Sequence, residues 1–131
     1  MNVLLDTRVL VWWLRNSARL GKHAKALIRD NATSVWVSSA TIWEISIKAA
    51  LDRLELDEEF EQRLPAELER SGFRLLAVKF DHAFGVRRLP LHHRDPFDRM
   101  LIAQAQWEGL TLVTADPNIM AYDVRTVDAS A

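Results

Sequence analysis

The chain contains no cysteine, and its 131 residues include only four glycines and four prolines. Without cysteine it can form no disulfide framework, no thiolate metal site and no cysteine nucleophile. Few glycines and prolines leave long stretches free to form helices and strands. The longest apolar run, over 9–14, is far too short to span a membrane. The N-terminus lacks the basic segment of a signal peptide, so we expect a soluble, cytoplasmic protein.

No charge of one sign dominates, because the chain has 17 Lys and Arg residues and 18 Asp and Glu residues, which give a formal net charge of -1. This balance excludes a protein held to nucleic acid by its net charge alone. A local basic stretch nevertheless lies over 79–99. We expect its arginines to line a groove that admits a phosphate backbone, with a solvated, salt-bridged loop as the alternative. They are Arg87, Arg88, Arg94 and Arg99.

Short apolar runs alternate with helical patterns along the whole chain, which predicts one α/β domain over 1–131, a parallel sheet flanked by helices. Pro65 is expected to start a new turn within its helix. The expected strands are 2–5, 35–37, 73–78 and 110–114, with an edge strand over 124–127. The expected helices are 9–16, 21–29, 41–51, 56–70, 81–88, 96–108 and a short last one from 117.

Two carboxylates follow predicted strands, and ligands of open parallel sheets bind beyond the carboxyl ends of strands. Asp6 follows the strand over 2–5, and Asp116 follows the strand over 110–114. Each aspartate also suits a helix N-cap, and Pro117 after Asp116 is typical of one. Both interpretations remain open for each residue.

Two further acids lie on apolar helix faces. Asp98 heads the stripe formed by Leu101, Ile102 and Ala105, where a carboxylate requires a cation or several donors. The alternative is that Asp98 lies in the first turn of the helix only because the helix dipole favours an acid there. Asp95, just before a proline, suits the N-cap position better. Glu44 lies among isoleucines and a tryptophan; a surface pair with the lysine at i+4 is the alternative to a buried polar role.

Together these four acids predict one acidic pocket. Several carboxylates stay ionised in a low-dielectric site only when a cation is present. Their oxygens suit hard divalent ions, Mg²⁺ or Mn²⁺, which commonly support phosphodiester cleavage by activating water. The pocket would be formed by Asp6, Glu44, Asp98 and Asp116.

Four segments in this order resemble the PIN-domain ribonucleases, and more narrowly the VapC-type toxins of bacterial toxin–antitoxin modules. Each segment alone is a weak signal, but all four within 131 residues form a strong one. They are LLDT over 4–7, SSATIWEISIK over 38–48, HRDPFDRMLIAQA over 93–105 and TLVTADP over 111–117.

The resemblance implies a PIN-like three-layer sandwich and a Mg²⁺- or Mn²⁺-dependent endoribonuclease. It places the family's metal-binding acids on Asp6, Glu44, Asp98 and Asp116, with Asp95 in reserve. Among these four catalytic acids we expect Asp6, Asp98 and Asp116 to hold the metal and Glu44 to orient or deprotonate the attacking water. The resemblance also implies a homodimer silenced by a cognate antitoxin, and a structured RNA substrate. The chain departs from the family at Arg8, where His or Asn is usual, so a weakened enzyme that mainly binds antitoxin is the alternative function.

Other interpretations remain. Adjacent histidines at 92 and 93 invite a zinc site, but without a third spaced ligand a solvated loop or RNA contact is favoured. Thr114 either holds a metal-bound water or is an ordinary strand residue. A phospho-acceptor domain would need an early acidic pair and a late lysine, and no lysine follows Lys79.

The chain has more large aromatic side chains than the core of a 131-residue domain evidently needs, notably Trp12, Trp13 and Trp36. This surplus predicts a homodimer with a partly aromatic interface.

Overall fold

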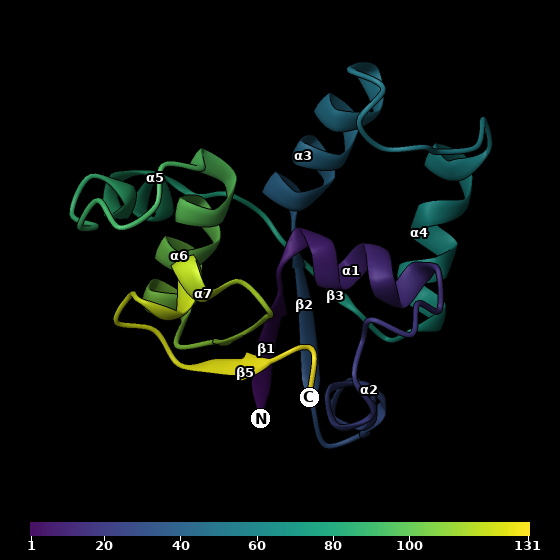
Figure 1. The fold of residues 1–131 in the computed structure, drawn as a ribbon, viewed down its shortest axis with the longest axis horizontal. Coiled ribbons are helices and arrows are strands. Elements are labelled where there is room, and N and C mark those ends of the chain that lie inside the picture. Colours follow the sequence, from purple (N-terminus) through teal and green to yellow (C-terminus); the bar gives the residue numbers. More distant parts are fainter.

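The computed structural model describes residues 1–131, which form one five-stranded, fully parallel sheet with helices on both faces. In Figure 1, α5, α6 and α7 lie to one side of the sheet, and α1, α2 and α4 lie to the other. The strands are β1 (Asn2–Leu5), β2 (Ser34–Ser38), β3 (Arg74–Leu76), β4 (Thr111–Thr114) and β5 (Thr126–Asp128). The helices are α1 (Thr7–Leu14), α2 (Lys22–Arg29), α3 (Ser39–Ala50), α4 (Phe60–Arg70), α5 (Phe80–Val86), α6 (Pro96–Glu108) and α7 (Pro117–Met120).

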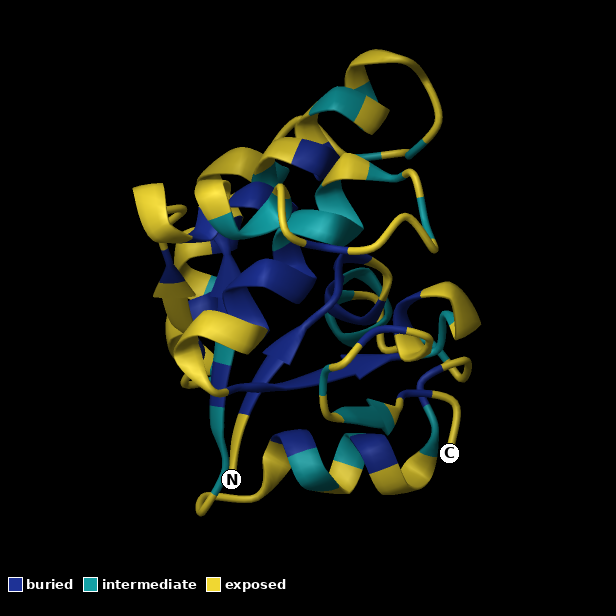
Figure 2. Cartoon of the chain, turned by 90° about the vertical axis from the view of Figure 1, so that its left-hand side faces the viewer, coloured by how far each residue is buried: buried dark blue, intermediate teal, exposed yellow.

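Two apolar cores fill the spaces between the sheet and its two helix layers, and the strands supply them alternately. Val3 and Leu5 belong to the core beneath α1, α2 and α4, whereas Leu4 belongs to the core beneath α6 and α7. Successive strand side chains point to opposite faces, so a run buried on both faces must be continuously apolar. Figure 2 shows the central strands almost entirely buried between helices whose outer faces are exposed. The predicted three-layer α/β sandwich is confirmed.

The strand order is β3-β2-β1-β4-β5. From β1 at the centre, β2 and β3 extend the sheet on one side, and β4 and β5 then extend it on the other. The order therefore reverses between β1 and β4. In open α/β sheets the crevice for ligands lies at this reversal, beyond the carboxyl ends of the two strands. Asp6 follows β1 directly, and Asp116 comes two residues after β4.

Several helix boundaries differ from those predicted. The helix predicted over 56–70 begins only at Phe60 and continues through Pro65 without a break, because Leu64 and Leu68 are buried in the core on either side of the proline. The third strand covers only 74–76 of the predicted 73–78. The fifth helix occupies 80–86 instead of 81–88, and the edge strand 126–128 instead of 124–127.

The tryptophans expected at a dimer interface pack partly against the cores of their own chain. Trp12 and Trp13 pack on the core beneath α1, and Trp36 packs on the opposite core. The indole N–H of Trp13 also donates a hydrogen bond to Ser71, and its ring lies 5.5 Å from that of Phe73. All three tryptophans are only partly buried, so each contributes to the fold and the predicted aromatic dimer interface stays a prediction.

None of the helices combines the length and the apolar character that crossing a bilayer requires.

Candidate active site

All four predicted acids line one pocket of about 370 Å³ at the carboxyl edge of the sheet. They come from four places far apart in the sequence: the ends of β1 and β4, the middle of α3 and the first turn of α6. Three cations, Arg8, Lys48 and Arg53, share the wall. The remaining residues of the lining are Thr7, Val11, Leu54, His93, Asp95 and Ala115.

Asp6 caps a helix and also faces the pocket, so its two interpretations are both correct. One carboxylate oxygen accepts the backbone N–H of Val9 at 2.8 Å and caps α1. The other accepts the hydroxyl of Thr114 on the neighbouring strand, at 2.5 Å. Burial raises the pKa of Asp6 above its ordinary value, although these two hydrogen bonds act to lower it. The site thus contains a buried carboxylate that a cation would stabilise.

Glu44 is buried and also pairs with Lys48, so it has features of both interpretations that the sequence left open. Its side chain is only 3% exposed, yet both oxygens are satisfied. One accepts the hydroxyl of Thr7 at 2.6 Å, and the other lies 2.6 Å from the ammonium of Lys48. These two contacts fix the orientation of the carboxylate.

Asp98 heads the buried stripe of α6, as predicted, and Leu101, Ile102 and Ala105 are all fully or almost fully buried. The pKa of Asp98 is raised from 3.8 to about 6, chiefly by burial and also by the carboxylates of Asp95, Glu44 and Asp6. A hydrogen bond from His93 opposes this rise. Unneutralised negative charge therefore accumulates at this end of the pocket.

Asp95 is the cap of α6. One of its oxygens accepts the backbone N–H groups of Phe97 and Asp98, at 2.9 and 3.1 Å. Both aspartates line the pocket, but only Asp98 belongs to the cluster of ligand atoms with His93 and Asp116, which favours Asp98 as the third acid of the site.

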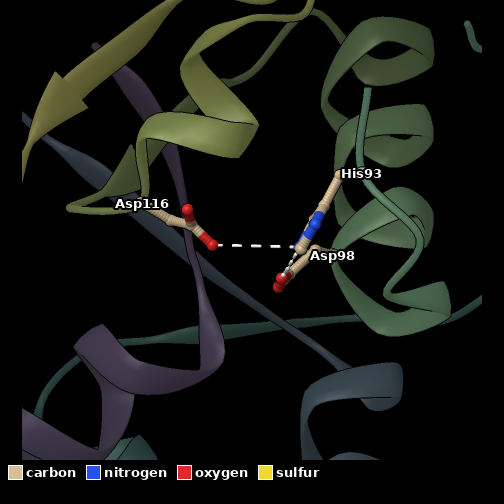
Figure 3. Close-up of side chains that lie close together, drawn as sticks. All are labelled: His93, Asp98 and Asp116. Atoms are coloured by element: carbon tan, nitrogen blue, oxygen red, sulfur yellow. Dashed lines mark hydrogen bonds and ion pairs between the residues drawn. The ribbon is translucent and has the colours of Figure 1, made fainter. Parts of the chain in front are cut away.

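His93 is a pocket residue whose position the sequence did not reveal. Its Nε2 lies 2.8 Å from a carboxylate oxygen of Asp98 and 3.8 Å from one of Asp116 (Figure 3). The three side chains each offer a ligand atom, and these atoms lie within 4.8 Å of one another. The only signal in the sequence is the spacing of the histidine, five residues before Asp98.

Thr114 is fully buried and joins the two strand-end acids. Its hydroxyl donates to Asp6 and accepts the backbone N–H of Asp116 at 3.1 Å. The first contact holds the Asp6 carboxylate and the second holds the backbone of Asp116, and the predicted contact of Thr114 with a metal-bound water stays a prediction.

The predicted arginine groove is not part of the pocket lining. Arg87, Arg88 and Arg94 are exposed outside it, and their predicted contact with substrate stays a prediction. The structure gives Arg99 a different role, because its guanidinium donates five hydrogen bonds, four of them to carbonyl oxygens between positions 86 and 93 and one to the hydroxyl of Tyr122. Both terminal nitrogens of Arg99 thus bind the loop, and its predicted contact with RNA stays a prediction.

The donor set fits a divalent ion. The pocket brings together carboxylate oxygens whose burial disfavours their charge, with one imidazole and no sulfur. Oxygen-rich sites of this kind suit Mg²⁺ and Mn²⁺.

Fold and pocket together define a class: a three-layer α/β protein with an acidic pocket at the reversal point of its parallel sheet. The chain belongs to the PIN domain family, whose profile matches residues 3–125.

Solved structures of similar fold include a toxin–antitoxin complex from Klebsiella pneumoniae, 20% identical with a TM-score of 0.65 and 97% of both chains covered. VapBC2 from Rickettsia felis, bound to a promoter DNA fragment, is 16% identical with a TM-score of 0.73, covering 97% of this chain and 98% of that one. DNA-bound VapBC from Salmonella typhimurium is 19% identical (TM-score 0.70), and FitAcB from Neisseria gonorrhoeae is 23% identical (TM-score 0.65); for each pair 98% of both chains is covered. No curated protein sequence matches the chain.

The raised pKa of Asp98 makes a prediction about stability. A carboxyl group whose pKa rises on folding binds more protons in the folded state, so the protein loses stability as pH rises from about 4 through 6. Two pKa units correspond to about 3 kcal/mol at most. We expect Asp98→Asn to raise the unfolding free energy of the metal-free protein by up to this amount at pH 7.5, and by less than about 1 kcal/mol near pH 4. Urea unfolding at both pH values measures the difference; an equal gain at both would contradict it.

Proposed function

We propose that the protein is a divalent-metal-dependent endoribonuclease, the toxin component of a type II toxin–antitoxin module. The observation that carries this proposal is the convergence of Asp6, Glu44, Asp98 and Asp116 in one pocket of a PIN domain. No structural requirement of the fold calls for four acids, contributed by four separate segments, at one edge of the sheet. We further propose that residues 1–131 act as a single PIN domain in the cytoplasm.

In this proposal Asp6, Asp98 and Asp116 hold Mg²⁺ or Mn²⁺. When bound, such an ion polarises a phosphoryl oxygen and increases the acidity of water. Glu44 then orients the attacking water and accepts its proton. Thr7 and Lys48 orient the Glu44 carboxylate, while Thr114 holds Asp6 against the end of β4.

The cations of the pocket would bind substrate phosphate. Arg8 is exposed at the start of α1, lines the pocket and forms no ion pair with Asp6 or Asp116. Its charge lowers the pKa of Asp6 from a distance, without contact. An arginine free in this position can donate two parallel hydrogen bonds to a phosphate. Arg87, Arg88 and Arg94 could extend this positive surface along the RNA.

Arg8→His is therefore expected to lower the cleavage rate without changing metal affinity. A hydrogen bond to a charged group contributes about 1.5–3 kcal/mol, so cleavage should fall by about 10- to 100-fold. Initial cleavage rates and calorimetric Mn²⁺ titration of both proteins test this expectation. A rise in both metal affinity and cleavage would instead show that Arg8 competes with the metal.

The proposed protein partners are a cognate antitoxin and a second copy of the chain. The VapBC and FitAB structures of similar fold are toxin–antitoxin complexes with DNA, which supports an antitoxin for this chain. A homodimer is supported by large apolar side chains that the fold leaves exposed, Trp43 on α3 and Phe80 and Phe84 on α5. A single monomeric species in sedimentation at micromolar concentration would refute the dimer.

Cleavage of RNA by the purified chain tests the proposed function. We expect a structured RNA to be cut in Mg²⁺ or Mn²⁺, left intact in EDTA, and cut again when metal is added in excess of the chelator. Cleavage that persists in EDTA would refute the metal mechanism. No cleavage in either metal, together with tight antitoxin binding, would favour the alternative of a weakened enzyme that acts as an antitoxin-binding module.

A further inference from the structure

We infer that His93 is a nitrogen ligand of the metal site and makes this site select Mn²⁺ over Mg²⁺. The inference rests on the proposed metal site but adds to it a residue and a preference that an all-carboxylate site would lack. It stands on three features of the structure: the position of the imidazole, the anchoring of its loop and the chemistry of nitrogen ligands.

The imidazole occupies the place of a ligand. Its Nε2 lies within 4 Å of carboxylate oxygens of both Asp98 and Asp116 (Figure 3). The ligand atoms of the three side chains all lie within 4.8 Å of one another, so they converge on one small space. Adjacent ligands of an octahedral ion with bonds of about 2.1 Å lie about 3.0 Å apart, and opposite ligands about 4.2 Å. The separations from Nε2, 2.8 Å to Asp98 and 3.8 Å to Asp116, fall close to this range. Small shifts would therefore let one ion contact all three side chains.

The loop that carries His93 is fixed from several directions. The backbone N–H groups of His92 and His93 both donate to the hydroxyl oxygen of Tyr122, at 3.1 and 2.9 Å. Arg99 donates to that same oxygen at 3.0 Å and also to the carbonyl of Pro90 at 2.9 Å. Tyr122 itself is buried. All these contacts are made by groups other than the imidazole, so the loop presents the ring to the pocket independently of the ring's own bonds.

His92 provides the contrast within the same loop. Its ring packs edge-on against Tyr122, with centroids 5.0 Å apart, is exposed, and does not line the pocket. Of two adjacent histidines, the fold therefore directs only His93 toward the acids.

A nitrogen ligand changes which ion the site prefers. Mg²⁺ binds oxygen ligands almost exclusively and loses its water reluctantly, whereas transition ions accept imidazole readily. An all-carboxylate pocket would favour Mn²⁺ only weakly. Adding the imidazole of His93 should strengthen Mn²⁺ binding while leaving Mg²⁺ binding almost unchanged.

The test compares wild type, His93→Gln and the matched control His92→Gln, by calorimetric titration of the metal-free proteins with MnCl₂ and with MgCl₂. In His93→Gln we expect Mn²⁺ affinity to fall by about tenfold or more and Mg²⁺ affinity to change by less than about threefold, the size range typical of lost metal-site contacts. His92→Gln should match wild type. Pulsed EPR of the Mn²⁺-loaded proteins should detect a directly coordinated nitrogen in wild type and in His92→Gln only.

The outcomes separate this inference from the proposed function. Saturable Mn²⁺ binding with no nitrogen coupling in wild type, and an unchanged Mn²⁺ to Mg²⁺ ratio in His93→Gln, would overturn the role of His93 and leave the carboxylate site standing. If wild type bound no Mn²⁺, or bound it no more tightly than Asp98→Asn, both the role of His93 and the carboxylate metal site would be overturned. Thermal unfolding of His93→Gln checks that the anchored loop keeps its fold, and His93→Asn serves as a second variant.

Discussion

Asp6→Asn is expected to lower RNA cleavage by more than about a hundredfold, because loss of even an outer contact of a metal site typically costs 10- to 100-fold. The fold should survive. Asparagine caps helices as well as aspartate does, so the bond from the N–H of Val9 is retained, and Thr114 can accept a hydrogen bond from the new amide. Since burial raises the pKa of Asp6, the substitution also removes an unfavourable buried charge. The melting temperature of the metal-free protein should equal or exceed that of wild type.

Asp30→Asn is the matched control for this substitution. Asp30 accepts the backbone N–H of Ala32 at 2.9 Å, in the turn that leads into the amino end of β2, away from the pocket. The control therefore removes one negative charge from a capping aspartate, and cleavage should stay within about twofold of wild type, as for a surface change far from the site. Cleavage by Asp6→Asn at a wild-type rate would refute the role of Asp6 as a metal ligand.

Arg99→Met is expected to produce the largest loss of stability, about 3–5 kcal/mol, with a melting temperature about 10 °C lower or more. Methionine preserves the apolar stem but removes the five hydrogen bonds that hold the loop over 86–93. Four carbonyl oxygens and the buried Tyr122 hydroxyl would each lose a charged partner. Urea denaturation followed by circular dichroism measures this loss.

Arg88→Met is the control, because Arg88 is exposed and lies in the same basic stretch. Surface substitutions of this kind change stability by about 0.5 kcal/mol or less. Equal, small losses for both variants would contradict the structural role of Arg99. If the two variants instead weakened RNA binding equally, the original prediction of a substrate contact would be supported.

The strand-end acids could be predicted because they depend on local sequence and on one rule of sheet topology. A buried parallel strand reads as a continuous apolar run, and the residue after it lies at the ligand-binding edge. Asp6 and Asp116 follow directly from this rule. Asp98 and Glu44 required one more step, since only an acid on an otherwise apolar helix face indicates a buried charge with a partner.

His93 and Arg99 could not be placed in the same way, because their positions depend on contacts between distant segments. The loop of His93 is held by Tyr122, 29 residues further along the chain. A basic stretch also looks the same whether an arginine faces solvent or binds its own backbone. Composition alone likewise did not reveal that Trp12, Trp13 and Trp36 pack partly against the cores of their own chain.

The central claim is that Asp6, Asp98 and Asp116 hold a divalent ion at the reversal point of the sheet. Anomalous diffraction from crystals containing millimolar Mn²⁺ tests this claim most directly, because the ion is located independently of any activity. We predict an anomalous peak in the pocket, about 2.0–2.3 Å from carboxylate oxygens of these residues. Wild-type crystals with no peak there, or with Mn²⁺ bound only at other acidic groups, would contradict the claim.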